Sequence, residues 1–292
     1  MMPANLRTFD RLPAGQSGQF VIPSALAPSR PVRHFFSLAG LLALLSPLAA
    51  QAQSAGSAPN DDPSYRKEFV YGLNFNTRGG LIGGVSVRSS KVLNEKWSRY
   101  WSIEGVEVKH PKERRLPSYN GSSFVRDKAN YMFVLRPTFG AQRVIFRKAP
   151  ESGVQINGLF GAGPSIGLLM PYYVYYDYTP RDSNYNALGP EDIRSEAYDP
   201  QKHSNLNLIF DRAPLFSGIN ELKPRVGAHV RGALSFEYGR YRDAVAGIET
   251  GFLLELYTKR PIIIRSLNVD ENSINNRFYP SVYLTVYLGS RS

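Results

Sequence analysis

The side chain best placed for acid–base chemistry in this sequence is His229, within the stretch RVGAHVRGALSFEYG. A histidine titrates near neutral pH, so one with charged neighbours can act as a general base or as a pH-sensitive element. In an extended chain Arg225 and Arg231 face the same side as His229, and Glu249 does so on the next predicted segment. The alternative is a structural histidine that is hydrogen-bonded within a polar network. We favour it because no recognisable set of nucleophile, base and orienting acid accompanies His229.

Other residues capable of chemistry have simpler explanations. His110 precedes a proline and His203 lies in a long polar segment, so we expect both to be solvated surface residues. The glycine-rich stretch GLFGAGPSIG lacks the Lys-Ser/Thr ending of a phosphate-binding loop. The acidic residues near 177–199 lack calcium-loop spacing, and the absence of cysteine removes disulfides and thiolate ligands. The sequence therefore predicts no catalytic residue, no metal site and no cofactor.

The stretch around His229 alternates polar and apolar residues along its length. Its even positions include Val226, Val230, Leu234 and Phe236, whereas its odd positions carry the charged side chains and small residues. A period of two residues is typical of a β-strand with two different faces. Either a soluble sheet or a membrane barrel would satisfy this pattern.

Seven other segments alternate in the same way, and turn residues separate them. The third segment loses its alternation near Gly105, where a bulge would return Val106 and Val108 to the apolar side. The glycines of the fifth suit a sharply bent or closely packed strand. In chain order the eight segments are 68–76, the residues around Val85 and Val87, 99–109, 130–146, 154 through GAGPSIGLLMP, 225–239, 244–257 and FYPSVYLTVYLG.

The lengths of the connections favour the membrane alternative. After a first short hairpin at 77–80, short and long connections alternate along the chain. A chain that weaves through a bilayer gives this pattern, because periplasmic turns are tight and outer loops are long. A sandwich with Greek-key crossovers gives no such regularity. The short connections are 92–98, 147–153 and 239–243, and the long ones are 110–129, 179–222 and 259–276. The segment 211–222 within the longest one could form one or two helical turns.

The polar faces of these segments carry charges of both signs. An eight-stranded barrel is filled by its own side chains, and buried charges must be paired. The arginines and glutamates nearly balance, as such a lumen requires. We therefore predict a polar lumen cluster of Arg88, Arg136, Arg225, His229, Arg231, Glu237, Glu249 and Glu255, accompanied by Glu68 and Glu104.

The sequence YYVYYDY is rich in tyrosine. Such a run could stack on sugars, but an aromatic belt at a membrane interface is the simpler interpretation. The predicted interface residues are Tyr172, Tyr173, Tyr175, Tyr176 and Tyr178.

The N-terminus indicates export. Arg30, Arg33 and His34 precede the apolar run FFSLAGLLALLSPLAA and the small residues AQA, which together predict a secretory signal peptide over 1–52. The apolar run is interrupted by Pro47 and is too short for a membrane-spanning helix. Because the residues before it form an unusually long lead-in, the true translation start could lie downstream of Met1. A polar leader follows at 53–67, and the barrel is expected over 68–292.

The chain is basic, with a formal net charge of +11. In an exported protein this charge favours attraction to anionic lipid or lipopolysaccharide at a membrane surface. Nucleic acid is not an expected partner, because basic runs with interleaved aromatic residues are absent from the sequence.

Three stretches resemble the uncharacterised outer-membrane β-barrel proteins of Bacteroidota, which are small barrels grouped with the PorT-like and OmpX/OmpW-like sets. They are NYMFVLRPTFGAQRVIFRK, VQINGLFGAGPSIGLLMPYYV and KPRVGAHVRGALSFEYG. The resemblance spans about 65–292 and implies residence in the outer membrane, without catalytic residues. One departure is the ending YLGSRS, since many such barrels end on an aromatic residue.

Together these features predict an all-β fold: an eight-stranded antiparallel up-and-down transmembrane β-barrel with long outer loops. The expected function is non-enzymatic. The barrel would act through its loops, as a structural or accessory component of an envelope protein complex, with gliding-associated and type IX secretion systems suggested by the resemblance alone. The alternatives are an outer-membrane enzyme acting on lipid or peptide, and a channel for small hydrophobic solutes.

Overall fold

The computed structural model describes residues 66–118, 120–147, 153–238 and 244–292. The predicted signal peptide at 1–52 lies outside the described residues, and so does the predicted leader except for Arg66 and Lys67. Within the described part of the chain, no helix combines the length and the apolarity needed to cross a membrane.

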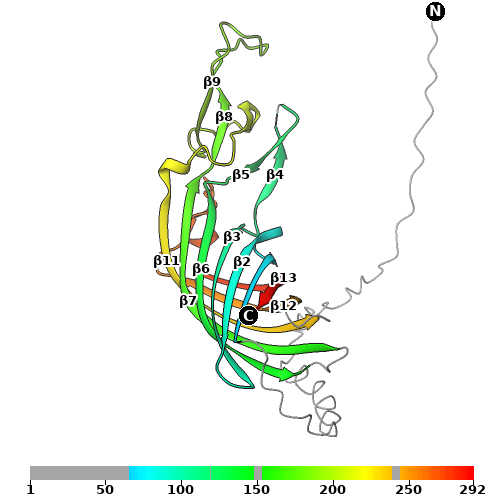
Figure 1. Cartoon of the computed structure of the whole chain (residues 1–292). Helices are drawn as coiled ribbons and strands as arrows, with labels where there is room; N and C mark the ends of the chain where they lie inside the picture. The colour runs from blue at the N-terminus through cyan, green and yellow to red at the C-terminus, as the bar shows by residue number, and fades with distance from the viewer. Residues whose placement is uncertain (1–65, 119, 148–152, 239–243) are drawn as a thin grey trace, which may run out of the picture. The chain divides into compact units, whose positions relative to one another are not determined.

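Eight long strands form a closed antiparallel β-barrel (Figure 1), as the sequence predicts. Each strand pairs with its neighbour in the chain, and the first strand pairs with the last to close the barrel, with Tyr71 opposite Leu288 and Phe75 opposite Leu284. The strands are β1 (Lys67–Asn76), β2 (Gly80–Val92), β3 (Trp97–Val108), β6 (Asn130–Phe146), β7 (Val154–Pro171), β11 (Lys223–Tyr238), β12 (Ala244–Tyr257) and β13 (Phe278–Arg291).

The two faces of β11 have the predicted orientations. Val226 and Val230 point outward and are 57% and 40% exposed, whereas His229 and Glu237 point inward and are buried. The same alternation holds around the barrel, so that apolar side chains cover the outside and polar side chains fill most of the inside.

The bulge predicted at Gly105 is wrong. Strand β3 pairs with β2 and β6 in continuous register through this point, and Val106 and Val108 point into the barrel. The apparent loss of phase arises because the interior is apolar at this height. There the two valines join a buried cluster with Met132, Val134, Leu169, Tyr257, Ile263, Ile264, Ile274 and Tyr279.

The glycines of β7 allow close packing, as expected for this segment. A Cβ atom at Gly163 would lie 2.0 Å from the carbonyl oxygen of Pro137 on β6, and one at Gly161 would lie 2.4 Å from the hydroxyl of Tyr100. Because real Cβ atoms never approach backbone oxygen so closely, the pairing of β6 with β7 requires a glycine at position 163.

The long connections leave the same end of the barrel, as Figure 1 shows. The first contains a hairpin of β4 (Arg114–Pro117) and β5 (Ser123–Arg126). The second contains a three-stranded sheet of order β10-β8-β9, made by β8 (Tyr173–Asp177), β9 (Ile193–Ala197) and β10 (Ile209–Arg212). These five short strands were not predicted from the sequence. Together with the other described residues of the two connections that contain them, 109–129 and 172–222, they are termed the extension.

In the part of the connections that the structure describes, helical structure is limited to single turns. The segment 211–222 ends in η3 (Ile219–Glu221), in keeping with the expected helical turn, although its first two residues belong to β10. The turn η2 (Leu206–Leu208) precedes β10, and α3 (Glu271–Ile274) lies in the connection from β12 to β13.

Candidate functional site

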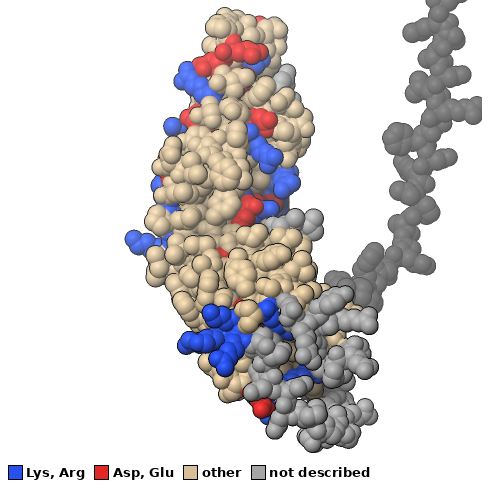
Figure 2. All heavy atoms as spheres, viewed as in Figure 1, with Lys and Arg blue, Asp and Glu red and all other residues tan. Residues whose placement is uncertain are grey.

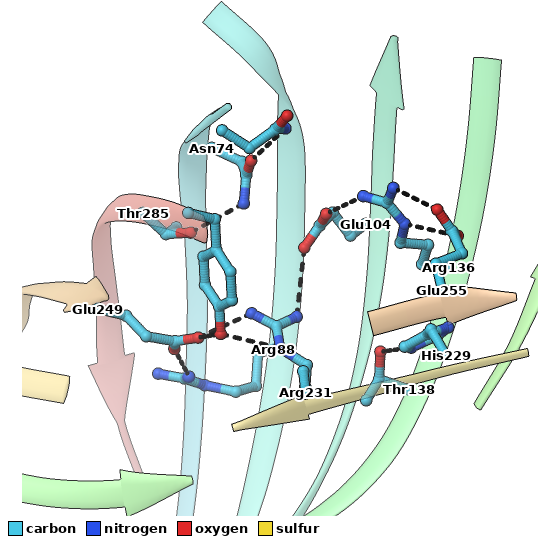
Figure 3. Close-up of polar contacts among 12 residues, drawn as sticks. Asn74, Arg88, Glu104, Arg136, Thr138, His229, Arg231, Glu249, Glu255 and Thr285 are labelled. Atoms are coloured by element: carbon cyan, nitrogen blue, oxygen red, sulfur yellow. Dashed lines mark hydrogen bonds and ion pairs between the residues drawn. The ribbon is translucent and has the colours of Figure 1, made fainter. Parts of the chain in front are cut away.

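A row of ion pairs crosses the middle of the lumen (Figure 3). Arg136 on β6 donates from Nε and Nη2 to the two carboxylate oxygens of Glu255 on β12, at 3.0 and 2.9 Å. Its Nη1 donates to Glu104 Oε1 on β3 at 2.8 Å. This two-pronged geometry fits the planar guanidinium group, and it connects three strands across the barrel.

The row continues through Arg231 on β11. Arg231 donates to Glu104 Oε2 at 3.2 Å and to Glu249 Oε1 at 2.8 Å. Tyr283 accepts from Arg231 Nε at 3.0 Å and donates to the same Glu249 oxygen at 2.7 Å, and Arg88 pairs with the other oxygen. Three arginines and three glutamates thus form one network, in which every charged group has a partner of opposite sign.

A second cluster lies toward the end of the barrel where the chain ends. Arg291, the last residue of β13, donates to Glu68 Oε2 at 2.8 Å and also pairs with Glu237. The side chain of Arg291 is 4% exposed, so this arginine is part of the lumen, whereas Ser290 and Ser292 are exposed. Arg291 was not among the predicted lumen residues, because the eighth segment was expected to end at Gly289.

His229 lies between two hydroxyl groups. Its Nε2 is 2.9 Å from Thr138 Oγ1 and its Nδ1 is 3.1 Å from Ser165 Oγ, and the residue is 2% exposed. Both ring nitrogens therefore have partners within the lumen.

The structure places seven members of the predicted lumen cluster as buried side chains inside the barrel, whereas Arg225 lies on the same face of β11 but is only half-buried. Near the start of this strand, Arg225 Nη1 donates to the carbonyl oxygen of Pro224 at 3.1 Å. No ion pair of Arg225 occurs within the described part of the chain. Its position faces the mouth, above the level of the glutamates.

The mouth on the long-loop side is plugged by the connection from β12 to β13. Ile263, Ile264 and Ile274 fold into the apolar cluster above the ion pairs. The buried side chain of Asn275 holds this connection together, because it accepts from the amides of Ile263 and Ile264 at 2.9 and 3.1 Å and donates to the Ile264 carbonyl at 2.8 Å.

One small cavity lies within the lumen. The cavity beside Arg88, Tyr100 and Glu249 measures about 20 Å³. That is room for about one water molecule.

The predicted interface tyrosines lie in the extension. Tyr172 and Tyr176 are buried, which corrects their assignment to a membrane belt, because they pack in the core of the extension. Tyr173 and Tyr175 are half-buried, and Tyr178 is 37% exposed. The core of the extension consists of Phe124, Tyr131, Met170, Tyr172, Val174, Tyr176, Tyr198 and Ile209.

His203 is likewise buried, not solvated as expected. Its ring contacts Tyr176 and Tyr198, with centroids 4.7 and 5.6 Å apart, and its Nδ1 accepts from the amide of Asp199 at 2.9 Å. Its Nε2 lies 3.2 Å from Glu196 Oε1. Because Tyr178 donates a hydrogen bond to Glu196, the pKa of this carboxyl lies below its ordinary value, and His203 lowers it further.

His110 also differs from the expectation of a surface residue. It is 5% exposed, and its Nε2 lies 3.1 Å from the carbonyl oxygen of Ile274 in the plug. Burial lowers the pKa of its imidazole. In the described residues, no group of three or more histidine, aspartate or glutamate side chains is arranged to hold a metal ion.

No protein-family model and no curated protein matches the sequence. Ail, the attachment invasion locus protein of Yersinia pestis, superposes with a TM-score of 0.33 and 11% identity over 78% of this chain and 99% of Ail, both alone and in complex with the heparin analogue sucrose octasulfate. Neisserial surface protein A superposes with a TM-score of 0.33 and 8% identity over 80% of this chain and all of that protein. This degree of similarity defines neither a family nor an activity for the chain.

Proposed function

We propose that the chain is a non-enzymatic outer-membrane β-barrel that acts through its extension, as an accessory component of an envelope export or assembly complex. The observation that carries the membrane assignment is the outer surface. Every barrel strand exposes large apolar side chains, and in water such a continuous surface would be unstable. Examples on successive strands are Leu73, Val85, Ile103, Leu135, Phe160, Val230, Phe252 and Val286, all between 40% and 64% exposed.

The two ends of the barrel give its orientation. Bacterial barrels have short turns on the periplasmic side and long loops outside the cell. The turn 93–96 and the end of β13 therefore face the periplasm, and the extension faces outward.

The lumen favours a structural role over catalysis or transport. His229 is held by two hydroxyl groups away from solvent, which leaves no access for a substrate. Charge pairs occupy the middle of the barrel, and apolar residues plug one mouth. A closed network of this kind holds the strands in register without leaving a path for solutes.

The extension offers a surface for a protein partner. The segment between β10 and β11 exposes Leu215, Phe216 and Ile219, which are 42%, 60% and 50% exposed. Apolar side chains gathered on a polar extension are typical of an interaction site. The assignment of this partner to an envelope complex follows the resemblance to small Bacteroidota barrels.

Two measurements test the membrane residence of the barrel and the closure of its lumen. Fractionation should place the chain in the outer membrane, with a band that shifts on heating in gel electrophoresis, and planar bilayers containing it should show no conductance above background. A chain recovered from the soluble periplasm would refute the barrel assignment. Stepwise ion conductance would refute the sealed lumen.

The accessory role is tested by co-purification from native membranes. We expect the chain to bring down a defined set of envelope proteins, and the triple variant Leu215→Ser, Phe216→Ser, Ile219→Ser to lose them. The variant Tyr185→Ser, Leu188→Ser removes two apolar side chains elsewhere in the extension that are more exposed still, 74% and 69%, and it should retain these proteins. A chain that purifies alone from native membranes would contradict the role.

A further inference from the structure

Three cations lie side by side on the outer face of the barrel. Lys67 on β1 is directly opposite Lys91 on β2, and Lys91 is directly opposite Arg99 on β3. All three are exposed and point outward. Like charges at directly opposed positions of a sheet repel one another, so this row costs stability unless an anion neutralises it.

The row has no protein counterion in the described part of the chain, in contrast with the lumen. Inside, Arg88, Arg136 and Arg231 all contact glutamates, and the buried Lys128 contacts Glu113. Lys67, Lys91 and Arg99 contact no carboxylate among the described residues. Figure 2 shows lysine and arginine side chains gathered on the lower part of the barrel in this view.

An open depression of about 500 Å³ adjoins the cations. Its apolar wall is formed by Trp101 and Phe139, which are paired across β3 and β6 and are 44% and 67% exposed. The small side chain of Ser89, which lies opposite Trp101 on β2, also lines the depression. Three cations beside an aromatic wall suit a molecule with an anionic head and an apolar tail.

The depression lies beside the short turn 93–96. Lys91 and Arg99 stand on the two strands that this turn joins, so they lie at the periplasmic edge of the apolar surface. Phospholipids, and not lipopolysaccharide, form the leaflet on that side. Lysine and arginine at such an edge attract anionic headgroups, and aromatic rings lie at the same level.

We propose that Lys67, Lys91 and Arg99 form a binding site for the phosphate headgroup of an anionic phospholipid in the periplasmic leaflet, with one acyl chain lying along Trp101 and Phe139. This inference rests on the proposed membrane residence of the barrel. The lipid would neutralise the row of cations and fix the depth of the barrel in the bilayer.

The two tryptophans of the chain make a direct test possible, because Trp97 and Trp101 both lie on the outer face of β3. The barrel is reconstituted in phosphatidylcholine vesicles that contain a minor fraction of brominated phosphatidylglycerol or, in parallel, brominated phosphatidylcholine. Bromine quenches tryptophan fluorescence on contact, so the ratio of quenching gives the relative affinity. We expect phosphatidylglycerol to be preferred by at least about fivefold, the factor expected for a single cation beside an anionic headgroup.

The variant Lys67→Gln, Lys91→Gln, Arg99→Gln should lose the preference. The variant Lys112→Gln, Arg114→Gln, Arg115→Gln removes the same charge from the exposed region of the β4–β5 hairpin and should retain it. Heat-modifiable migration in gels checks that both variants fold.

Several results would overturn the site. Equal quenching of the wild type by the two lipids would do so, as would a preference that survives in the Lys67, Lys91, Arg99 variant. A preference abolished by inorganic phosphate at constant ionic strength would assign the site to a free anion. Absence of quenching by either lipid would instead refute membrane residence, and the proposed function with it.

Discussion

Arg136 shows how single residues hold this barrel closed. Its guanidinium group pairs with Glu255 and Glu104, and all three side chains are buried. Such a pair contributes little net stability when compared with an apolar replacement of both partners, but removal of one partner leaves a charge buried without compensation. The asymmetry makes Arg136 a sensitive point in the lumen.

Replacement of Arg136 by methionine should lower the free energy of unfolding by about 3–5 kcal/mol, because the buried Glu255 loses its guanidinium partner and Glu104 keeps only Arg231. Urea unfolding in lipid vesicles, followed by tryptophan fluorescence, measures the change. Arg225→Met is the matched control: that arginine is half-buried, and within the described residues its side chain donates only to the Pro224 carbonyl. We expect the control to differ from the wild type by less than about 1 kcal/mol. Equal losses in the two variants would contradict the paired network.

Because of Glu196, the stability of the extension should depend on pH in the acidic range. Its folded-state pKa is depressed by the hydrogen bond from Tyr178 and by His203, so it stabilises the extension above its unfolded pKa. This contribution is lost as the pH falls from the unfolded pKa through the lower folded pKa. The carboxyl carbon signal of Glu196 in NMR titrations should have a midpoint below the ordinary glutamate value.

Tyr178→Phe is the informative variant, because it removes only the donated hydroxyl. The Glu196 midpoint should rise toward the ordinary glutamate value, and the extension should lose order at a higher pH than in the wild type. An unchanged midpoint would show that the hydrogen bond does not form in solution.

At the scale of elements, the register between β6 and β7 depends on close backbone contact at Gly163. A methyl group there would clash with the Pro137 carbonyl oxygen. Because this oxygen belongs to the backbone of the neighbouring strand, it cannot move away without disturbing the strand pairing. This contact explains why a strand in the barrel wall can contain so many glycines without loss of order.

Gly163→Ala should therefore destabilise the barrel by at least about 1–3 kcal/mol, the usual cost of overpacking. Gly105→Ala on β3 is the control, since a Cβ atom there meets nothing within 4 Å. Its stability should be unchanged or up to about 1 kcal/mol greater, because alanine loses less backbone entropy on folding. Heat-modifiable migration and urea unfolding measure both. A neutral Gly163→Ala would indicate a different strand register.

The eight barrel strands were predictable because each has a period of two over its length, and neighbouring strands carry the same pattern. The strand prediction was wrong where the side chains that point into the barrel are apolar. Val106 and Val108 face a plug that comes from a connection more than 150 residues further along the chain, at Ile263 and Ile264. No local pattern in β3 could indicate that contact.

The candidate site was predictable to a similar degree and for a similar reason. Arginines and glutamates on one face of a barrel must lie in the lumen, so most of the cluster followed from alternation alone. Its partners depend on the strand order and the shear of the barrel, which the alternation does not determine. Tyr172 and Tyr176 were assigned to a membrane belt because a run of tyrosines gives no sign of the separate hydrophobic core in which they pack.

At the scale of the whole molecule, the barrel has two unlike ends and a uniform apolar wall between them. One end carries the extension with its own core and its exposed apolar segment. The other carries short turns and the row of cations Lys67, Lys91 and Arg99, which have no carboxylate partner among the described residues. This asymmetry suits a barrel that is inserted in a bilayer with one fixed orientation. Lipid would then contact the end with the short turns, and a partner would contact the extension at the opposite end.

Membrane residence requires that the outward face of the barrel contacts lipid. The chain has no cysteine, so single cysteines can carry a spin label. Labels at Val230→Cys and Leu254→Cys, on the outer faces of β11 and β12, should be relaxed by membrane-soluble oxygen and not by a water-soluble nickel chelate in vesicles. A label at Arg115→Cys in the β4–β5 hairpin should show the reverse. Free access of the nickel chelate to positions 230 and 254 would contradict the membrane barrel.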